Sequence, residues 1–491
     1  MLTNPHFVAL LPLVLVAATA ITVMLGIAWR RAHAATVAVT VLGLLLALVA
    51  QGVAWQLAPV DTPLLAFDDI AMMGGMLILG STLVCAILAH AYLEVFEGAR
   101  EEFYLLLLCA AAGGLVLAAS RHMASLFFGL ELLSMPLYGM LAYSFRERRS
   151  LEAGIKYLIL SAAASAFLLF GMALLYAQTG ELRLDELMTV LTETSGVWGL
   201  AGIALMVVGL GFKLSVVPFH LWTPDVYEGG PGPATTFLAT ASKVAVFFLL
   251  LRLVLYVPAF QGEWLRTLLA ILALLSMVIG NLLALTQSNI KRILGYSSIA
   301  HFGYLLVALV VGDGLAAETG GVYLITYVLT TLAAFGVVTL VSSSTSGEDA
   351  AALHYYRGLF WRRPYLTAVL TISMLSLAGI PATAGFIGKF YIIALGVEAQ
   401  RWWLVGGIIL GSAIGLYYYL RVMVTLFMLE PGMQRRDAPH DWGTRAGGLV
   451  VLAVAFLVIL LGLYPAPMIE LAELLGGTPL GGTPLGGTPL S

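Results

Sequence analysis

Long apolar runs recur from one end of this 491-residue chain to the other. Each run has about 20 residues, the length that an α-helix needs to cross the ~30 Å hydrocarbon core of a bilayer. Hydrophobic residues make up 60% of the chain and charged residues only 10%, against about 25% charged in a soluble domain. We therefore expect an all-α polytopic membrane protein.

The apolar runs and the helix-breaking residues between them predict fourteen helices. The seventh ends in a kinked run with Pro218 and Pro224, and the twelfth contains Gly379, Pro381 and Gly385, so both are expected to be broken. The predicted spans are residues 7–29, 35–56, 69–93, 103–119, 123–143, 154–177, 198–218, 233–257, 264–286, 293–311, 319–342, 365–396, 402–428 and 446–464.

Spans 4–8 and 9–13 form two sets of five, and the fourth member of each set is interrupted by proline and carries a lysine. Because five is odd, the two sets have opposite orientations, which is the arrangement of a transporter with inverted repeats. The expected units are an N-terminal three-helix segment (1–100), a first five-helix repeat (101–260), a second, inverted repeat (261–430), a C-terminal transmembrane helix (431–470) and a flexible tail of GGTPL repeats (471–491).

Loop charges predict the orientation, because Lys and Arg are enriched on the cytoplasmic side. Loops after odd-numbered spans are basic, whereas loops after even-numbered spans hold few basic residues and several acidic ones. Both termini are therefore expected in the periplasm of a bacterium, and the first span reads as retained rather than as a cleaved signal. The basic residues are Arg30, Arg31, Arg100, Arg146, Arg148, Arg149, Lys156, Lys291, Arg292, Arg357, Arg362, Arg363, Arg435, Arg436 and Arg445, and the acidic ones are Asp61, Asp68, Asp69, Asp185, Glu186, Glu193, Asp313 and Glu318.

Three lysines and one glutamate lie inside apolar spans: Lys213, Lys243, Lys389 and Glu131. A charge at the bilayer centre costs roughly 2.5–3.5 kcal/mol, so such residues mark functional sites. Burial disfavours the charged form of lysine, which can then exchange protons at neutral pH, and a nearby Glu131 would oppose this effect at Lys213. Fixed ion pairs or snorkelling side chains are the alternative, although snorkelling fits Lys213 and Lys243 poorly.

Other polar residues could assist a proton path. His220 follows the lysine of the seventh span by seven residues, and His301 lies inside the tenth span. Histidine can relay protons near neutral pH, but a lone histidine in a helix is more often a satisfied polar contact, and both readings stay open. Lys156 could equally be an interfacial anchor, and Arg421 a counter-charge near the path.

The chain has no Walker A motif, no dinucleotide fingerprint, no CxxC metal spacing and no haem-binding CxxCH. Cys85 and Cys109 fall in adjacent apolar runs and read as small core residues. We therefore expect no cofactor on this chain, and any energy that it uses must come from an ion gradient or a partner subunit.

Four stretches carry a resemblance to a known family. GLGFKLSVVPFHLWTPDVYEGGPGPATTFLATASKVAVFF (209–248) resembles the proton-translocating, antiporter-like subunits of respiratory complex I, and FHLWTPDVYEG in particular is similar to the subunit N family. LELLSMPLY around Glu131, NIKRILGYSSIAHFGY (289–304) and LAGIPATAGFIGKFYI (377–392) match the same family in order and spacing. Together they cover roughly residues 100–430.

The resemblance implies fourteen helices with two inverted repeats. It also implies a subunit that pumps protons while other subunits transfer electrons from NADH to a quinone such as ubiquinone. NADH, FMN, iron–sulfur clusters and quinone would be bound by those partner subunits, and the chain's neighbours would be antiporter-like and small helical membrane subunits in the inner membrane, with no nucleic acid. Carried over by motif, the proton-translocating residues are Glu131, Lys213, Lys243 and Lys389, with accessory positions at His220, Lys156 and His301.

Two other functions remain open on the sequence. A subunit of a multi-subunit sodium/proton antiporter would use similar lysines without electron transfer. A non-pumping membrane scaffold would keep the same charges as structural pairs. Partner subunits that carry flavin and iron–sulfur clusters would distinguish the first of these from the complex I reading.

Overall fold

The computed structural model of the chain describes residues 5–57, 59–94, 98–187, 196–256, 262–342, 349–428 and 446–476. Some residues used in the sequence analysis lie outside these ranges. They are the loop residues Glu193, Arg435, Arg436 and Arg445 and the GGTPL repeats beyond Gly476.

The described residues are mostly helical, with one hairpin of two strands that have two residues each. The helices are α1 (Pro5–Trp29), α2 (His33–Trp55), α3 (Asp69–Glu94), α4 (Glu102–Ala118), α5 (Met123–Leu141), α6 (Arg148–Thr179), α8 (Val197–Leu214), α9 (Trp222–Gly229), α10 (Gly232–Ala239), α11 (Ala241–Tyr256), α12 (Glu263–Leu285), α13 (Ile290–Val311), α14 (Gly314–Ser342), η2 (Leu353–Tyr356, a 3-10 helix), α15 (Leu359–Arg362), α16 (Pro364–Ala378), α17 (Ala384–Glu398), α18 (Trp402–Phe427), α19 (Ala446–Leu463) and α20 (Ala466–Gly476). The antiparallel hairpin joins β1 (Val60–Asp61) to β2 (Ala66–Phe67).

Within the described ranges, twelve helical segments are long and apolar enough to cross a membrane, with α10 and α11 counted as one. The apolar helices α4 and α16 are shorter. The prediction of an all-α polytopic membrane protein is therefore confirmed, while the count of fourteen spans stays a prediction.

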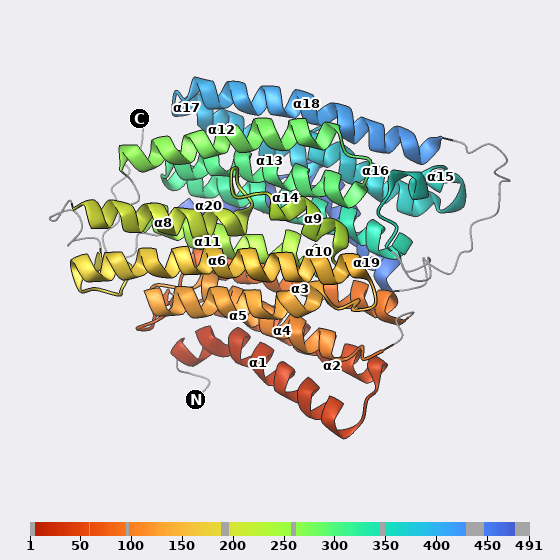
Figure 1. Ribbon diagram of the computed structural model, residues 1–491, viewed down its shortest axis with the longest axis horizontal. Helices are drawn as coiled ribbons and strands as arrows, with labels where there is room; N and C mark the ends of the chain where they lie inside the picture. The colour runs from red at the N-terminus through yellow and green to blue at the C-terminus, as the bar shows by residue number, and fades with distance from the viewer. Residues whose placement is uncertain are drawn as a thin grey trace.

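The long helices lie side by side in one layered bundle, with α1 and α2 at one edge and α17 and α18 at the other (Figure 1). The helix α19 returns to pack against α3, α14, α16 and α17. In the first predicted repeat α4 packs on α5, and α6 packs on both halves of the broken span, α8 and α9; in the second, α12 packs on α13, and α14 packs on both halves of the broken span, α16 and α17. These equivalent pairings agree with two repeats. The bounds of the predicted units stay predictions, and α20 crosses the bound placed at residue 470.

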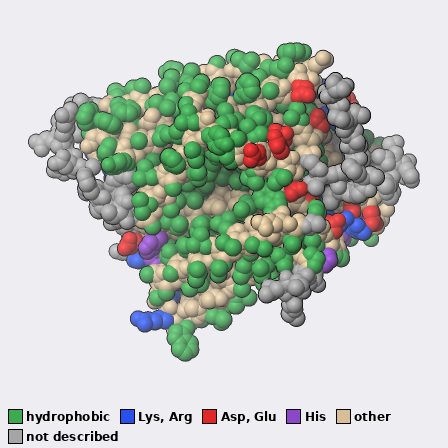
Figure 2. Space-filling model, turned by 180° about the vertical axis from the view of Figure 1, so that it is seen from behind, with side chains coloured by type: hydrophobic (Ala, Val, Ile, Leu, Met, Phe, Trp, Pro, Cys, Tyr) green, Lys and Arg blue, Asp and Glu red, His purple; other side chains and the backbone are tan. Residues whose placement is uncertain are grey.

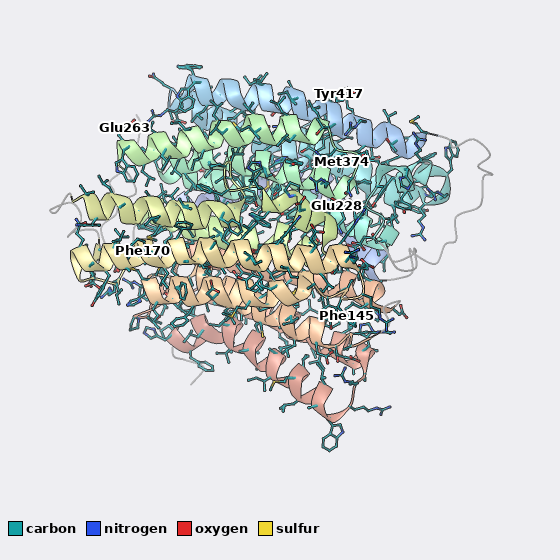
Figure 3. The ribbon with its side chains drawn as sticks, in the orientation of Figure 1. Phe145, Phe170, Glu228, Glu263, Met374 and Tyr417 are labelled. Carbon is teal, nitrogen blue, oxygen red and sulfur yellow. The ribbon has the colours of Figure 1, made fainter. Side chains whose placement is uncertain are left out.

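The bundle has two ends, where the helices meet their loops. Phe145 and Glu263 lie at opposite ends (Figure 3). We call the end that holds Phe145 the Asp225 end, because Asp225 lies there in contact with Lys156 of α6 and with Arg292 in the first turn of α13. We call the other the Arg121 end, since Arg121 follows α4 and pairs with the loop after α6.

The outer surface matches a lipid environment. Hydrophobic side chains cover most of the face seen in Figure 2, and Lys and Arg gather near its left and right margins. On α6, Phe167 and Phe170 are among many exposed apolar side chains. Apolar surface of this extent is expected where lipid rather than water covers the protein.

Both predicted helix breaks are present. The helix α8 ends at Leu214, Ser215 has φ of +64°, and the chain resumes as α9 only at Trp222. The helix α16 ends at Ala378, and Gly379 has φ of +82° before α17. A left-handed residue terminates a helix because it turns the following N–H groups back toward the last carbonyls.

A third break was not predicted. The eighth span is interrupted at Thr240, between α10 and α11, where φ is −117° and ψ is −87°. The Thr240 hydroxyl donates to the Thr236 carbonyl at 2.7 Å, and the Thr236 hydroxyl donates to the Gly232 carbonyl at 2.7 Å. Hydroxyl groups that bond a carbonyl four residues earlier bend helices, and this signal is weaker than proline or glycine.

Candidate functional site: buried lysines at broken helices

Lys213 lies in the last turn of α8, next to its break. Its Nζ donates to Ser134 Oγ of α5 at 2.6 Å and to Ser161 Oγ of α6 at 2.7 Å. The Nζ atom also lies 5.4 Å from the centre of the Tyr157 ring. The side chain is buried. Hydroxyl groups and an aromatic face, rather than a carboxylate, therefore surround this amine.

Glu131 lies on the same α5–α6 seam as Lys213. It accepts a hydrogen bond from Ser165 Oγ at 2.6 Å. Glu131 lies one helical turn from Ser134, and Ser165 one turn from Ser161, so the two sites are neighbours along both helices. No ion pair joins Glu131 to Lys213 in the described part of the chain. That Glu131 acts on the charge of Lys213 stays a prediction.

Lys243, on α11, contacts the end of α8 at its break. It lies in the first turn of α11 and is fully buried. Its Nζ donates to Ser298 Oγ at 2.7 Å and to the Leu214 carbonyl at 3.3 Å, and lies 4.8 Å from the centre of the Phe302 ring. Leu214 is the last residue of α8, so its carbonyl lacks an intrahelical donor. The negative end of the α8 dipole favours a cation there.

Lys389 makes an equivalent contact in the second repeat. Its Nζ donates at 2.9 Å to the carbonyl of Ala378, the last residue of α16, and lies 5.5 Å from the centre of the Tyr304 ring. A Cβ atom on Gly379 would lie 2.6 Å from the Lys389 Cδ atom. Glycine is therefore required at this break both for its positive φ and for the space that the lysine occupies.

One face of α13 connects the last two lysines. Ser298, His301 and Tyr304 are spaced three residues apart and so lie on successive turns of the same face. Ser298 contacts Lys243, and the ring of Tyr304 lies beneath Lys389. His301 lies between these two contacts, and the tertiary structure therefore brings three predicted residues into one line.

Two tyrosines hold the His301 ring. Its Nδ1 lies 2.7 Å from Tyr323 Oη of α14, and its Nε2 lies 3.2 Å from Tyr419 Oη of α18. Tyr419 also hydrogen-bonds Ser297 at 2.5 Å. The sequence analysis did not name Tyr323 or Tyr419, because tyrosines in apolar spans are common and their positions along the chain do not show that they meet His301.

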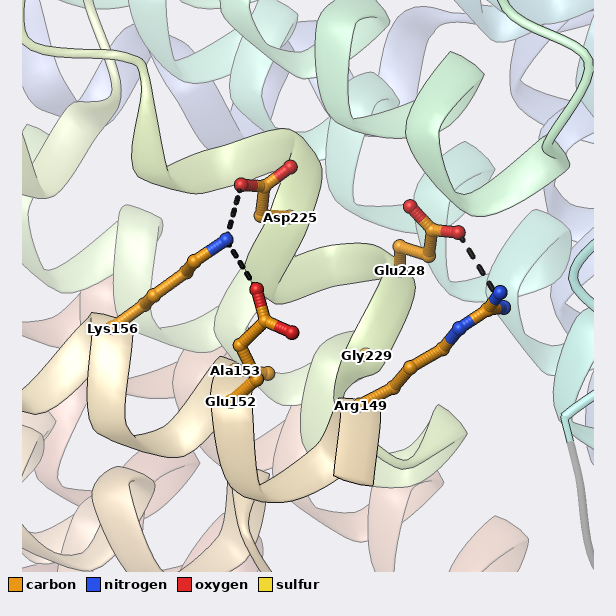
Figure 4. A pocket seen from close by; sticks show the side chains of 7 residues that line it. All are labelled: Arg149, Glu152, Ala153, Lys156, Asp225, Glu228 and Gly229. Carbon is orange, nitrogen blue, oxygen red and sulfur yellow. Dashed lines mark hydrogen bonds and ion pairs between the residues drawn. The ribbon is translucent and has the colours of Figure 1, made fainter. Parts of the chain in front are cut away.

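Lys156 lies apart from this line, at the Asp225 end. Its Nζ contacts Glu152 at 2.6 Å and Asp225 at 2.8 Å, and its side chain is 39% exposed (Figure 4). Arg292 of α13 contacts the other oxygen of Asp225 at 2.7 Å. Burial raises the pKa of Asp225, but the hydrogen bonds and charges of Lys156 and Arg292 lower it further, so the pKa lies below its usual value. Asp225 is therefore ionised at neutral pH.

Two other residues from the sequence analysis have separate positions. His220 is buried in the turn between α8 and α9. Among the described residues its Nδ1 atom has no hydrogen-bond partner, and no hydrogen bond joins His220 to Lys213. Arg421 donates to the carbonyls of Leu285 and Gln287 at 2.9 and 2.5 Å. Arg421 thus binds the end of α12 and is not a counter-charge to a carboxylate in the described structure.

Two buried ion pairs were missed. Arg252 of α11 makes two hydrogen bonds of 2.7 Å to Asp68, with both side chains almost fully buried. Lys291, interpreted above only as a loop charge, is fully buried and contacts Asp349 and the Gly230 carbonyl at 2.6 Å each. No pattern in the sequence could have paired residues that lie this far apart along the chain.

The described residues contain no group of three or more His, Cys, Asp or Glu side chains arranged to hold a metal ion. Cys85 is buried and Cys109 partly buried, and both are free thiols. The chemistry that the described arrangement offers is therefore that of amines, an imidazole, carboxylates and hydroxyl groups.

Known proteins resemble the chain over almost its whole length. Residues 120–415 match the family described as "NADH:quinone oxidoreductase/Mrp antiporter, TM". The NADH-quinone oxidoreductase subunit N of Chromohalobacter salexigens is 71% identical over 464 residues, which are 94% of this chain and 97% of the relative. Subunit N of Ectopseudomonas mendocina is 61% identical over 477 residues, 96% of this chain and 97% of the relative.

Solved structures of membrane complexes contain chains with the same fold. A chain of respiratory complex I from Thermus thermophilus with bound aureothin superposes with a TM-score of 0.80 at 36% identity, covering 94% of this chain and 99% of that one. A chain of the Mrp complex from Dietzia sp. has a TM-score of 0.85 at 20% identity, covering 96% and 97%, and shows the fold alone. The chain therefore belongs to the NADH:quinone oxidoreductase/Mrp antiporter transmembrane family, within the branch formed by subunit N of NADH-quinone oxidoreductases.

Proposed function

We propose that this chain translocates protons as a membrane subunit of a NADH-quinone oxidoreductase. The relatives that are 61–71% identical carry the name of that subunit, whereas the likeness to the Mrp chain is a likeness of fold. The antiporter and scaffold alternatives therefore receive less support.

The observation that carries the proposal is the kind of partner each buried lysine has. Within the described residues, Lys213, Lys243 and Lys389 are hydrogen-bonded only to hydroxyl and carbonyl oxygens. Lys291, by contrast, is buried against the carboxylate of Asp349. A buried amine without a counter-ion is poised to release its proton, whereas a paired one retains it. Three unpaired lysines therefore suit transport, and Lys291 suits a structural role.

The line of contacts suggests a route for the protons. Protons would pass from the Lys213 site to Lys243, which bonds the carbonyl next to Lys213, and then along the α13 face past His301 to Lys389. Glu131 would tune Lys213 through its charge, and His220 and Lys156 would act as accessory groups. Hydroxyl groups can both donate and accept, so they can pass a proton between these sites.

The remaining steps would take place on other subunits. Oxidation of NADH, electron transfer through FMN and iron–sulfur clusters, and reduction of quinone would belong to partners of this chain. Antiporter-like and small helical subunits would be its membrane neighbours. The Asp225 end would face the cytoplasm and both termini the periplasm, in a bacterial inner membrane.

The test is proton pumping by variants of Lys213, measured in sealed inverted membrane vesicles per NADH oxidised. Lys213→Ala should lose this chain's share of pumping in an assembled complex, because no group remains to cycle. Lys213→Arg should also be impaired, because arginine cannot release its proton near neutral pH.

The double change Lys291→Ala with Asp349→Ala is a matched control, since it removes a buried lysine that already has a counter-ion. It should lower the yield of complex but leave pumping per assembled complex unchanged. Full pumping by Lys213→Arg would refute a protonation cycle at this position.

A further inference from the structure

The break between α8 and α9 leaves an unwound segment, residues 215–221, at the surface of the bundle. Leu221 is 75% exposed, and Pro218 is also exposed. Val217, by contrast, is only 4% exposed. One side of this segment therefore faces outward, and the other side faces spans of the same chain.

Within the described residues, one hydrogen bond joins this segment to another span. The Val217 N–H group donates to Ser276 Oγ of α12 at 2.9 Å, and the Ser276 hydroxyl donates to the Leu272 carbonyl at 2.7 Å. Ser276 is fully buried, and a buried N–H group that loses its acceptor is costly. Since α12 begins the second predicted repeat, the break of the first repeat is anchored to the second.

The break between α16 and α17 is anchored differently. There the Gly385 N–H group donates to Ser376 Oγ at 3.0 Å, and Ser376 belongs to α16 of the same span. Ser376 also hydrogen-bonds Thr330 of α14 at 2.8 Å. The helices α14 and α16 both belong to the second predicted repeat, so this break is held within its own repeat. The bond to Ser276 is therefore not a general feature of the two breaks.

The anchor on α12 lies at a tight contact with α13. A Cβ atom on Gly303 would lie 2.8 Å from the Met277 backbone nitrogen and 3.0 Å from the Ser276 Cβ atom. The two helices are in close contact here and should move together. Gly303 lies between His301 and Tyr304 in sequence, so the first break is linked through α12 to the part of α13 that carries these side chains.

We propose that Ser276 is a positioning residue whose hydrogen bond to Val217 couples the break beside Lys213 to the second repeat, so that the two repeats change position together. The inference rests on the proposed function of the buried lysines. Ser276 acts in this role through the backbone of Val217 and passes no proton itself.

Loss of this bond should disturb the lysine contact at the break. Ser276→Ala removes the acceptor of the Val217 N–H group, and an unpaired N–H group is unfavourable at membrane depth. The segment should then shift toward another acceptor. The Leu214 carbonyl, three residues before Val217, would shift with it and weaken its bond of 3.3 Å from Lys243.

The test combines hydrogen exchange with proton pumping. Exchange is measured by mass spectrometry on the complex in lipid nanodiscs, in peptides that contain residues 215–221. Ser276→Ala should speed exchange of the Val217 amide roughly fivefold, as expected for the loss of one hydrogen bond. In sealed inverted vesicles with equal amounts of assembled complex, pumping per NADH oxidised should fall toward the value of Lys213→Ala.

Ser373→Ala is the matched control. Ser373 is also fully buried, and its hydroxyl donates to the Val369 carbonyl at 2.9 Å, but it accepts no hydrogen bond from another segment among the described residues. Exchange in residues 215–221 and pumping per NADH should both stay unchanged. If Ser276→Ala and Ser373→Ala gave equal exchange, or equal pumping per NADH, the proposal would be overturned.

Ser276→Cys keeps the test decisive if Ser276→Ala fails to assemble. A thiol sulfur is a weaker acceptor than a hydroxyl oxygen, so exchange should be faster and pumping lower than in the unchanged protein. Unchanged values in this variant would sink the inference. Normal pumping by Lys213→Ala would instead refute the proposed function, whatever the Ser276 variants show.

Discussion

Asp68→Ala should destabilise the protein severely, because it strands a buried charge. The side chains of Arg252 and Asp68 are 4% and 2% exposed, and both carboxylate oxygens accept bonds of 2.7 Å. After the change the guanidinium keeps, among the described residues, only the Ala118 carbonyl at 3.3 Å. Breaking a buried pair in this way costs about 3–5 kcal/mol.

Removing both charges should cost much less. Replacing a buried pair by apolar residues is often neutral, so Asp68→Leu with Arg252→Met should lose little from the pair itself. Asp68 also accepts a hydrogen bond of 3.0 Å from the Ala71 N–H at the start of α3, and loss of this cap costs about 1 kcal/mol. Asp68→Ala and the double variant both lose this bond, so it cancels between them, and the double variant should be about 3–5 kcal/mol more stable than Asp68→Ala.

The assay is the yield of assembled complex on native gels together with the midpoint of its thermal inactivation. Glu186→Ala is the control, because its ion pair with Arg183 joins side chains that are 50% and 39% exposed. Such a pair contributes only about 0.2–1 kcal/mol. A double variant that is less stable than Asp68→Ala would refute the reasoning, because the loss would then not come from an unpaired cation.

Three further outcomes follow from the structure. Gly379→Ala and Gly379→Ser should both abolish pumping in assembled complex. Any Cβ at this position meets the Lys389 side chain, and the left-handed φ costs a residue with a Cβ about 1–2 kcal/mol. Normal pumping by either variant would contradict this prediction. Lys243→Ala combined with Lys389→Ala should cost about as much pumping as the worse single change, because coupled sites respond non-additively. Multiplicative losses of pumping in vesicles would show that the two lysines act independently. Burial raises the pKa of Asp185, but hydrogen bonds from Arg121 and Arg183 lower it by more, so the pKa lies below its usual value. The stability that this adds is present above the unfolded pKa of about 3.9 and is lost as pH falls through the lower folded value, so the thermal midpoints of the protein and Asp185→Asn should differ most at neutral pH and converge in acid.

The sequence identified the buried charges because their surroundings in the chain are apolar. Lys213, Lys243 and Lys389 stand inside runs long enough to cross a membrane, and a charge there is costly whatever the fold. Two of the three helix breaks could likewise be predicted, because proline cannot continue a helix and Gly379 permits the positive φ that ends one, and both are local properties. The break at Thr240 could not, since a threonine bends a helix only where its hydroxyl binds a carbonyl of the preceding turn.

Which groups face those charges was decided by the tertiary structure. The serines around Lys213 come from α5 and α6, and the carbonyls that bind Lys243 and Lys389 are free only because α8 and α16 end there. The same holds for Asp225, whose two cationic partners, Lys156 and Arg292, come from different predicted repeats.

A sequence thus determines which side chains are charged, how apolar their surroundings are and where the backbone must turn, because these are local properties. Whether a buried lysine has a counter-ion depends on what the packed helices bring beside it. Lys291 looked like an ordinary loop charge and is buried against Asp349. Lys213 and Glu131 are each hydrogen-bonded to serines, and an interaction of their charges stays a prediction. Partners of this kind are selected by long-range packing, which residue spacing along one chain does not encode.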